Sequence, residues 1–273
     1  MNKDLKQINN FKRNSGFTLA EVFSVHPKGG RKHGFTLAEV LITLGIIGVV
    51  AAMTLPVLIA KHQKKVTVTK LKKLYSELNT VMNVAASENA EDSSNWTYPE
   101  TTDSPEMENF IKTYFLPYFK GATFYSRDEF TRNIRSTIKN LADKEIEILA
   151  PGLILANGQF IQFMVNNPER TGYIWLIADL NGRSLPNKVG RDIFVFNAYS
   201  KHVNHQKTKD RVGFYYIYYE NYDFLNHDGP EEDTLNNGGY GCSKSNKYGY
   251  YAGWFCGQII YLNKWQIPDD YPW

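Results

Sequence analysis

A run of 26 residues near the N-terminus, Phe35–Ala60, is almost entirely apolar and holds a single formal charge, Glu39. A helix of about 20 apolar residues spans the hydrocarbon core of a bilayer. We therefore predict that this run crosses a membrane. It is longer than the core of an ordinary secretory signal, which ends in small residues at a cleavage site. Whether this run crosses a membrane decides the compartment in which the rest of the chain folds.

Basic residues are concentrated before this run. Residues 1–34 hold seven Lys or Arg and two acids, whereas the rest of the chain holds 24 basic and 26 acidic residues, a net charge of −2. Because Lys and Arg favour the cytoplasmic side, we place the N-terminus there. The local rule is equivocal, since further basic residues follow the run: Lys61, His62, Lys64 and Lys65. A net charge of −2 also argues against DNA as a partner, because DNA affinity grows with the number of cations.

Glu39 needs a partner. A lone carboxylate in a membrane helix costs about 2.5–3.5 kcal/mol, and nothing basic lies within one turn before it. Cleavage after Gly34 would create an ammonium on Phe35 that neutralises Glu39, in the same or a neighbouring chain. Pro56 removes one backbone hydrogen bond and is predicted to bend or locally melt the helix. The plainer alternative is a simple signal-anchor helix.

The segment KHGFTLAEVLITLGIIGVVAAMTLPVL resembles the N-terminal cleavage and methylation segment of type IV prepilins and type II secretion pseudopilins. The resemblance implies that a prepilin peptidase cuts between Gly34 and Phe35 and methylates Phe35. It also implies that Glu39 serves assembly and that Pro56 is the helix kink. It covers about residues 31–90 and says little of the rest.

The heptapeptide GFTLAEV occurs twice, at Gly16–Val22 and at Gly34–Val40. Cleavage after Gly16 would leave a polar stub of 18 residues between the new terminus and the membrane helix. We therefore interpret the second copy as the functional one. The first is either a duplication within the leader or lies upstream of the true start. The predicted parts are a leader that is removed, a membrane half of the helix, an amphipathic half and an extracytoplasmic domain: 1–34, 35–60, 61–90 and 91–273.

Helical periodicity continues after Ala60. One apolar stripe recurs at three- and four-residue steps, which predicts a helix from about Thr36 to about Ser87; it comprises Leu71, Leu74, Leu78, Val81 and Ala85. Residues 104–149 are also predicted to be helical. Their two apolar faces are interpreted as core: Phe110, Ile111, Tyr114, Phe115 and Tyr118, and then Phe130, Ile134, Ile138 and Leu141.

From Ile146 the pattern changes to strands. Leu153–Ala156 and Phe160–Val165 flank Asn157-Gly158, a favoured hairpin turn. Further strands are predicted at Tyr173–Ala178, Ile193–Phe196 and Phe214–Tyr219. The predicted fold class is α+β, with one long helix packed on a mostly antiparallel sheet, as in pilins.

One loop suggests a cation. Asp179 and Asn181 precede Gly182, and Asp192 lies before the next predicted strand, so their oxygens could hold Ca²⁺. The stretch resembles a loop of secretion pseudopilins, some of which bind calcium. Ordinary Asx-turn chemistry is the alternative. No other cofactor is expected. The acidic loop Asp228–Asp233 and the pair His202 and His205 are interpreted as solvated loops.

Cys242 and Cys256 are the two cysteines of the chain and lie in a section predicted to be rich in strands. Buried thiols would be the ordinary reading in the cytosol, but on the far side of the membrane a disulfide is expected. Closing a loop of about 15 residues contributes roughly 3 kcal/mol in the chain-entropy model. The resemblance points the same way, because pilins often close a C-terminal loop with a disulfide.

These features predict a filament subunit rather than an enzyme, and no G-x-S-x-G, H-E-x-x-H or P-loop pattern is present. The Asp-x-Asn-Gly loop and the aromatic sheet favour a type II secretion pseudopilin over a type IV pilus or competence pilin. A membrane-anchored extracytoplasmic enzyme or binding protein is the alternative from another class. The expected partners are a prepilin peptidase, other subunits, the inner-membrane assembly machinery and membrane lipid, but no nucleic acid. The expected location is single-pass in the inner membrane, with filaments in the periplasm or at the cell surface.

Overall fold

The structure is a computed structural model of the 273-residue chain. It describes residues 34–89, 93–134, 137–165, 173–199, 212–214, 241–242 and 250–273. The chain divides into two units, Met1–Leu55 and Pro56–Trp273. The described part of the first unit is the beginning of one long helix. The second unit holds the rest of that helix and both sheets.

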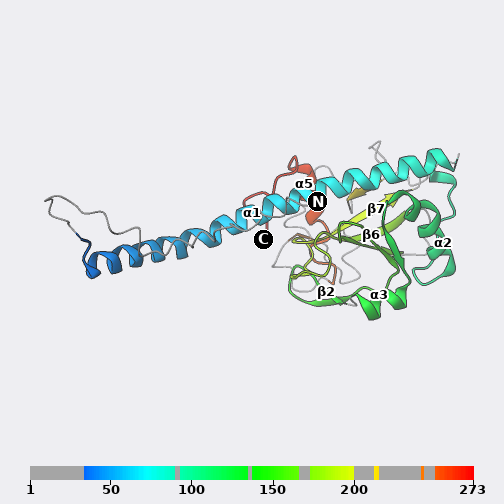
Figure 1. The fold of residues 1–273 in the computed structure, drawn as a ribbon. Helices are drawn as coiled ribbons and strands as arrows, with labels where there is room; N and C mark the ends of the chain where they lie inside the picture. The colour runs from blue at the N-terminus through cyan, green and yellow to red at the C-terminus, as the bar shows by residue number, and fades with distance from the viewer. Residues whose placement is uncertain are drawn as a thin grey trace, which may run out of the picture. The chain divides into compact units, whose positions relative to one another are not determined.

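Helix α1 spans Leu37–Glu88, 52 residues, close to the predicted bounds (Figure 1). It is assigned as helix without interruption through Pro56, so the local melting that we considered at this residue is not present. The stripe of Leu71, Leu74, Leu78, Val81 and Ala85 is buried, which confirms it as the core face.

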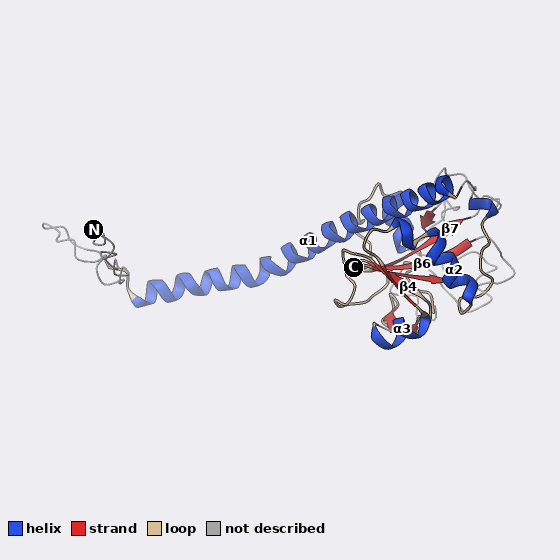
Figure 2. Cartoon of the chain, turned by 45° about the vertical axis from the view of Figure 1, so that its right-hand side comes forward, coloured by secondary structure: helices blue, strands red, loops and turns tan. Residues whose placement is uncertain are grey.

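The buried stripe of α1 shares one hydrophobic core with a six-stranded antiparallel sheet. The long helix and the sheet confirm the α+β class (Figure 2). The strand order of the sheet is β1-β4-β5-β6-β7-β8. The longest pairing joins the central strands β6 and β7 over seven positions. The strands are β1 (Thr123–Tyr125), β4 (Gly152–Ile154), β5 (Phe160–Met164), β6 (Tyr173–Asp179), β7 (Ile193–Tyr199) and β8 (Val212–Phe214).

Residues 104–149 are not one helical region, and this part of the prediction is wrong. They contain two short helices, a 3-10 turn, β1 and a separate two-stranded sheet: α2 (Pro105–Tyr114), η3 (Leu116–Tyr118), α3 (Arg127–Asn133), β2 (Thr137–Lys139) and β3 (Glu145–Glu147). A further 3-10 turn, η2, precedes them at Ser93–Asn95. Ser126 opens α3 with a capping box to Glu129. Ile138 and Ile146 alternate with exposed neighbours, a strand pattern too short to recognise. Six of the nine predicted core residues are buried, and the other three, Tyr114, Tyr118 and Ile134, are half-buried. The buried six are Phe110, Ile111, Phe115, Phe130, Ile138 and Leu141.

The hairpin of β4 and β5 is confirmed, but its turn differs from the expected two-residue Asn-Gly type. The N–H of Leu155 donates to Gln159 O, and the N–H of Gly158 donates to Leu155 O, both at 2.9 Å. Only Gly158 has a positive φ, +82°. This is the three-residue loop in which a type I turn is followed by a left-handed glycine.

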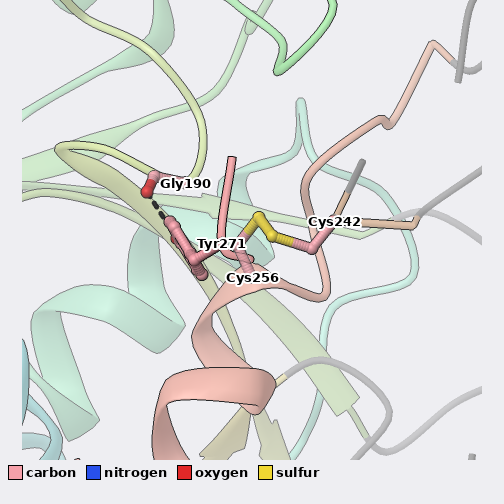
Figure 3. The surroundings of a disulfide bond; sticks show 4 residues. All are labelled: Gly190, Cys242, Cys256 and Tyr271. Carbon is pink, nitrogen blue, oxygen red and sulfur yellow. Dashed lines mark hydrogen bonds between the residues drawn. A yellow bond between two sulfur atoms is a disulfide. The ribbon is translucent and has the colours of Figure 1, made fainter. Parts of the chain in front are cut away.

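The Cys242–Cys256 disulfide is confirmed (Figure 3). Cys256 begins a helix, α5 (Cys256–Leu262), so the C-terminal section is not rich in strands among its described residues. Next to the disulfide, the buried Tyr271 hydroxyl donates to the carbonyl of Gly190 (Figure 3). Gly190 has φ +80°, and a Cβ there would lie 2.8 Å from Cys256 Sγ. The predicted strand after Phe214 lies outside the described residues.

The buried amide of Asn79 joins α1 to strand β8. Its Oδ1 accepts the Val212 N–H at 2.9 Å, and its Nδ2 donates to Val212 O at 3.0 Å. The Asn79 side chain therefore takes the place of a further strand on the side of β8 that faces away from β7. Tyr75, one turn earlier, stacks on Phe214 with ring centroids 5.5 Å apart.

We expect Asn79→Ala to lower the free energy of unfolding by about 2–6 kcal/mol. The substitution leaves both polar groups of Val212 buried without Asn79, and each costs about 1–3 kcal/mol. Urea unfolding followed by circular dichroism checks this. Thr80→Ala, at the next and exposed position of α1, is the control and should change stability by less than about 0.5 kcal/mol. Equal stability of the two variants would contradict this role of Asn79.

Candidate processing and assembly site

The predicted cleavage site lies immediately before α1 and is exposed. The Phe35 side chain is 87% accessible. A Cβ built on Gly34 would meet nothing within 4 Å. Gly34 is therefore not required by packing within the described chain, which agrees with a role in recognition by another protein.

Glu39 forms a capping box with Thr36 at the start of α1. Glu39 Oε2 accepts the Thr36 N–H at 2.7 Å and the Thr36 hydroxyl at 2.8 Å. The Glu39 N–H in turn donates to Thr36 Oγ1 at 3.2 Å. Thr-x-x-Glu before an apolar run is a known helix-start signal, and it went unrecognised among the sequence motifs considered above. Thr36 is thus a hydrogen-bonding partner of the Glu39 carboxylate, in addition to the cation expected from charge alone.

This arrangement leaves room for a cation. Both contacts use Oε2, and no described residue donates to Oε1. The terminal nitrogen of a chain cut after Gly34 would belong to Phe35, the residue before the cap. An ammonium there, or on a neighbouring chain, would meet a carboxylate already oriented by Thr36.

The membrane half of α1 presents an apolar surface on all sides. The structure has, in its described part, one helix long and apolar enough to cross a membrane; its most apolar 18-residue window has mean hydropathy 2.4 and no buried residue. The exposed large side chains include Leu41, Ile42, Leu44, Ile46, Ile47, Val49, Val50, Met53, Leu55, Val57, Leu58 and Ile59. Pro56 lies near the end of this series, and its role as a kink stays a prediction.

Asn181 and Asp192 lie close together in the structure, as the calcium hypothesis requires. Their polar atoms are, however, largely used in hydrogen bonds within the loop itself. Asp192 Oδ2 accepts from Asn181 Nδ2 at 2.9 Å and from the Asn187 N–H at 2.8 Å. Asp179 Oδ1 accepts the N–H groups of Asn181 and Gly182 at 3.0 and 2.9 Å. These contacts of Asp179 form an ordinary Asx turn.

The metal hypothesis remains a prediction. Burial raises the pKa of Asp192, while N–H groups of Lys188 and Asn187 favour its ionised form. Asn181 Oδ1 is buried, and no described residue donates to it, so this oxygen is available to a cation. No three His, Cys, Asp or Glu side chains gather anywhere in the described part of the chain. His202, His205, the loop 228–233 and the first GFTLAEV copy lie outside the described residues.

Two family models match the chain. Residues 30–55 match the prokaryotic N-terminal methylation motif, and these residues include Gly34, Phe35 and Glu39 but not the first copy of the heptapeptide. Residues 57–273 match a family of unknown function (DUF6613). No curated protein and no solved structure matches the chain.

The methylation motif agrees with the predicted cleavage segment and with the exposed apolar beginning of α1. It implies processing by a prepilin peptidase and assembly with other pilin subunits. The N-terminal segment is therefore that of a type IV prepilin or pseudopilin, and the chain is a pilin-like member of the family of unknown function DUF6613.

Proposed function

We propose that this protein is a filament subunit of the type II secretion pseudopilin kind, cut and N-methylated at Phe35 and assembled through α1. One observation carries the proposal. The second half of α1 is core, with Leu71, Leu74 and Leu78 fully buried, whereas the large apolar side chains of residues 35–60 are exposed in the described part of the chain. An exposed series of this length is typical of a surface that lipid or another protein covers.

Two environments cover this apolar surface one after the other, first lipid and then neighbouring subunits. Before assembly, lipid surrounds the apolar half, because each Leu, Ile or Val removed from water contributes about 1.5–3 kcal/mol. After assembly, the same half packs against the helices of neighbouring subunits. The carboxylate of Glu39 then selects the register, since it is stable in an apolar surrounding only next to a cation.

The choice of a secretion pseudopilin rests on the aromatic sheet and on the Asp-x-Asn-Gly loop, which opens the segment between β6 and β7. This turn is held against α1, because Lys70 Nζ donates to the carbonyl of Leu180 at 3.1 Å. A subunit of a surface pilus is the other candidate within the class. The two differ in the machinery that assembles them, and expression with each machinery in turn would distinguish them.

We expect prepilin peptidase to cut the chain between Gly34 and Phe35 and to leave Phe35 methylated. Intact-mass measurement of the membrane-extracted protein checks both events. The duplicated heptapeptide offers a matched control, because the same substitution can be placed at either copy. Gly34→Val should abolish processing, and Gly16→Val should leave the mature mass unchanged. A mature chain beginning at Phe17, or blocked by Gly16→Val, would contradict the assignment.

Charge and capping at Glu39 can be separated, because Gln also serves in a capping box whereas Ala does not. We expect Glu39→Gln to keep membrane insertion and the helix start but to reduce filament yield at least tenfold. Glu39→Ala should be no better. Quantification of sheared filaments from cells that carry the assembly machinery checks this. Normal yield with Glu39→Gln and loss only with Glu39→Ala would mean that the cap, not the charge, matters.

A further inference from the structure

The cations that follow the apolar run are unusual for their position. Lys61, Lys64 and Lys65 lie directly after Ala60, on the side where the large domain folds. On that side the positive-inside rule predicts few such residues. Filament assembly through residues 35–60 gives them no role.

Two cations, one of them from this lysine group, lie near the ring of a C-terminal tryptophan. Lys64 Nζ lies 5.8 Å from the centroid of the Trp273 ring, and the Arg191 guanidinium carbon lies 5.4 Å from it. Arg191 is itself held to α1, because Thr67 Oγ1 donates to its carbonyl at 3.4 Å. We call Lys61, Lys64, Lys65, Arg191 and Trp273 the juxtamembrane cluster. All five belong to the unit Pro56–Trp273.

The position of the cluster along α1 matches the headgroup layer. Lys64 is four residues beyond Ala60, about 6 Å along a helix. Its contact therefore brings Trp273 and Arg191 to the level at which the apolar surface ends. Tryptophan is enriched at this level of membranes, and Lys and Arg extend their charged ends into it.

The cations of the cluster are not neutralised by the described chain. No ion pair joins Lys61, Lys64, Lys65 or Arg191 to any described acid, whereas Lys188 nearby in sequence is paired with Asp143 at 2.6 Å. Asp269 and Asp270 lie on the same C-terminal segment as Trp273, are exposed and pair with none of these cations. The four cations therefore have no ion-pair partner among the described residues, which suits this surface to binding an anion.

We propose that the juxtamembrane cluster binds the anionic phospholipid headgroups of the membrane that α1 spans. It thereby docks the globular domain on that membrane before assembly. This inference rests on the proposed function, because it requires α1 to be inserted. The occupant is lipid rather than a soluble anion, since the cluster continues directly from the apolar surface. Each Lys or Arg near an anionic surface adds to the attraction, which weakens with salt.

The test uses the full mature chain in nanodiscs. One set contains phosphatidylcholine alone, and the other contains equal parts phosphatidylcholine and phosphatidylglycerol. Hydrogen–deuterium exchange of the peptides that contain Arg191 and residues 268–273 reports docking. We expect slower exchange with phosphatidylglycerol, reversed by high salt. Lys64→Gln/Arg191→Gln should lower the docking equilibrium constant roughly 30-fold.

A matched control exists on the same helix. Lys72 also lies over a tryptophan, Trp265, at 5.9 Å, and Lys73 is next to it. Both lie well beyond the end of the apolar run, so Lys72→Gln/Lys73→Gln should dock like the unchanged chain. Exchange of the α1 core peptides verifies that each variant is folded.

Three results would overturn the inference: equal exchange in the two lipids, equal loss of docking in the control variant, or the same protection from soluble glycerol phosphate with phosphatidylcholine discs. Failure of the proposed function is distinguishable from these, because a chain whose α1 does not insert would not co-elute with nanodiscs at all.

Discussion

The structure depends on a single helix that has to satisfy two different surroundings. From Leu71 to Ala86 one face of α1 is part of the protein core, packed on an antiparallel sheet. From Phe35 to Ala60 the same helix is apolar and exposed in the described chain. A soluble fold would have covered this surface. Its exposure, next to a predicted cleavage site, is the physical reason for proposing a subunit that is inserted and then assembled.

The globular unit holds its end of α1 by polar as well as apolar contacts. Asn79 bonds both backbone groups of Val212, which closes the edge of β8. The segment between β6 and β7 is held from two sides, by Lys70 and Thr67 of α1 and by Tyr271 near the disulfide. The Cys242–Cys256 bond lies beside Tyr271, two residues before Trp273, whose ring lies under Lys64 of α1.

Long periodic signals were read correctly from the sequence, and short ones were not. The bounds of α1 and its buried stripe followed from repeated spacing over many residues, whereas the β4–β5 hairpin followed from the turn signal Asn157-Gly158 between two apolar runs. The region 104–149 was misread because three-residue strands such as β2 and β3 carry one apolar residue each, which does not distinguish a period of two from a helical period. The capping box of Thr36 and Glu39 is visible in the sequence as Thr-x-x-Glu, but the partner expected for Glu39 was a cation rather than a neutral hydroxyl and N–H.

Contacts that join distant segments were beyond sequence reasoning. Nothing in the spacing connects Asn79 with Val212, or Lys64 and Arg191 with Trp273, because each pairing depends on how the sheet lies against α1. In the Asp179 loop, a motif in the sequence suggested more than the local contacts show. Its residues suggested a metal, and the structure shows that most of the same oxygens also satisfy backbone N–H groups.

The central claim is that the apolar half of α1 exchanges lipid for neighbouring subunits. A photo-crosslinking amino acid at Ile47, whose side chain is 63% exposed, tests it directly. The account predicts crosslinks to lipid in cells without the assembly machinery. With the machinery it predicts crosslinks between two copies of the chain, and these should disappear when cleavage at Gly34 is blocked. Crosslinks that never join two copies, or that join them equally without cleavage, would contradict it.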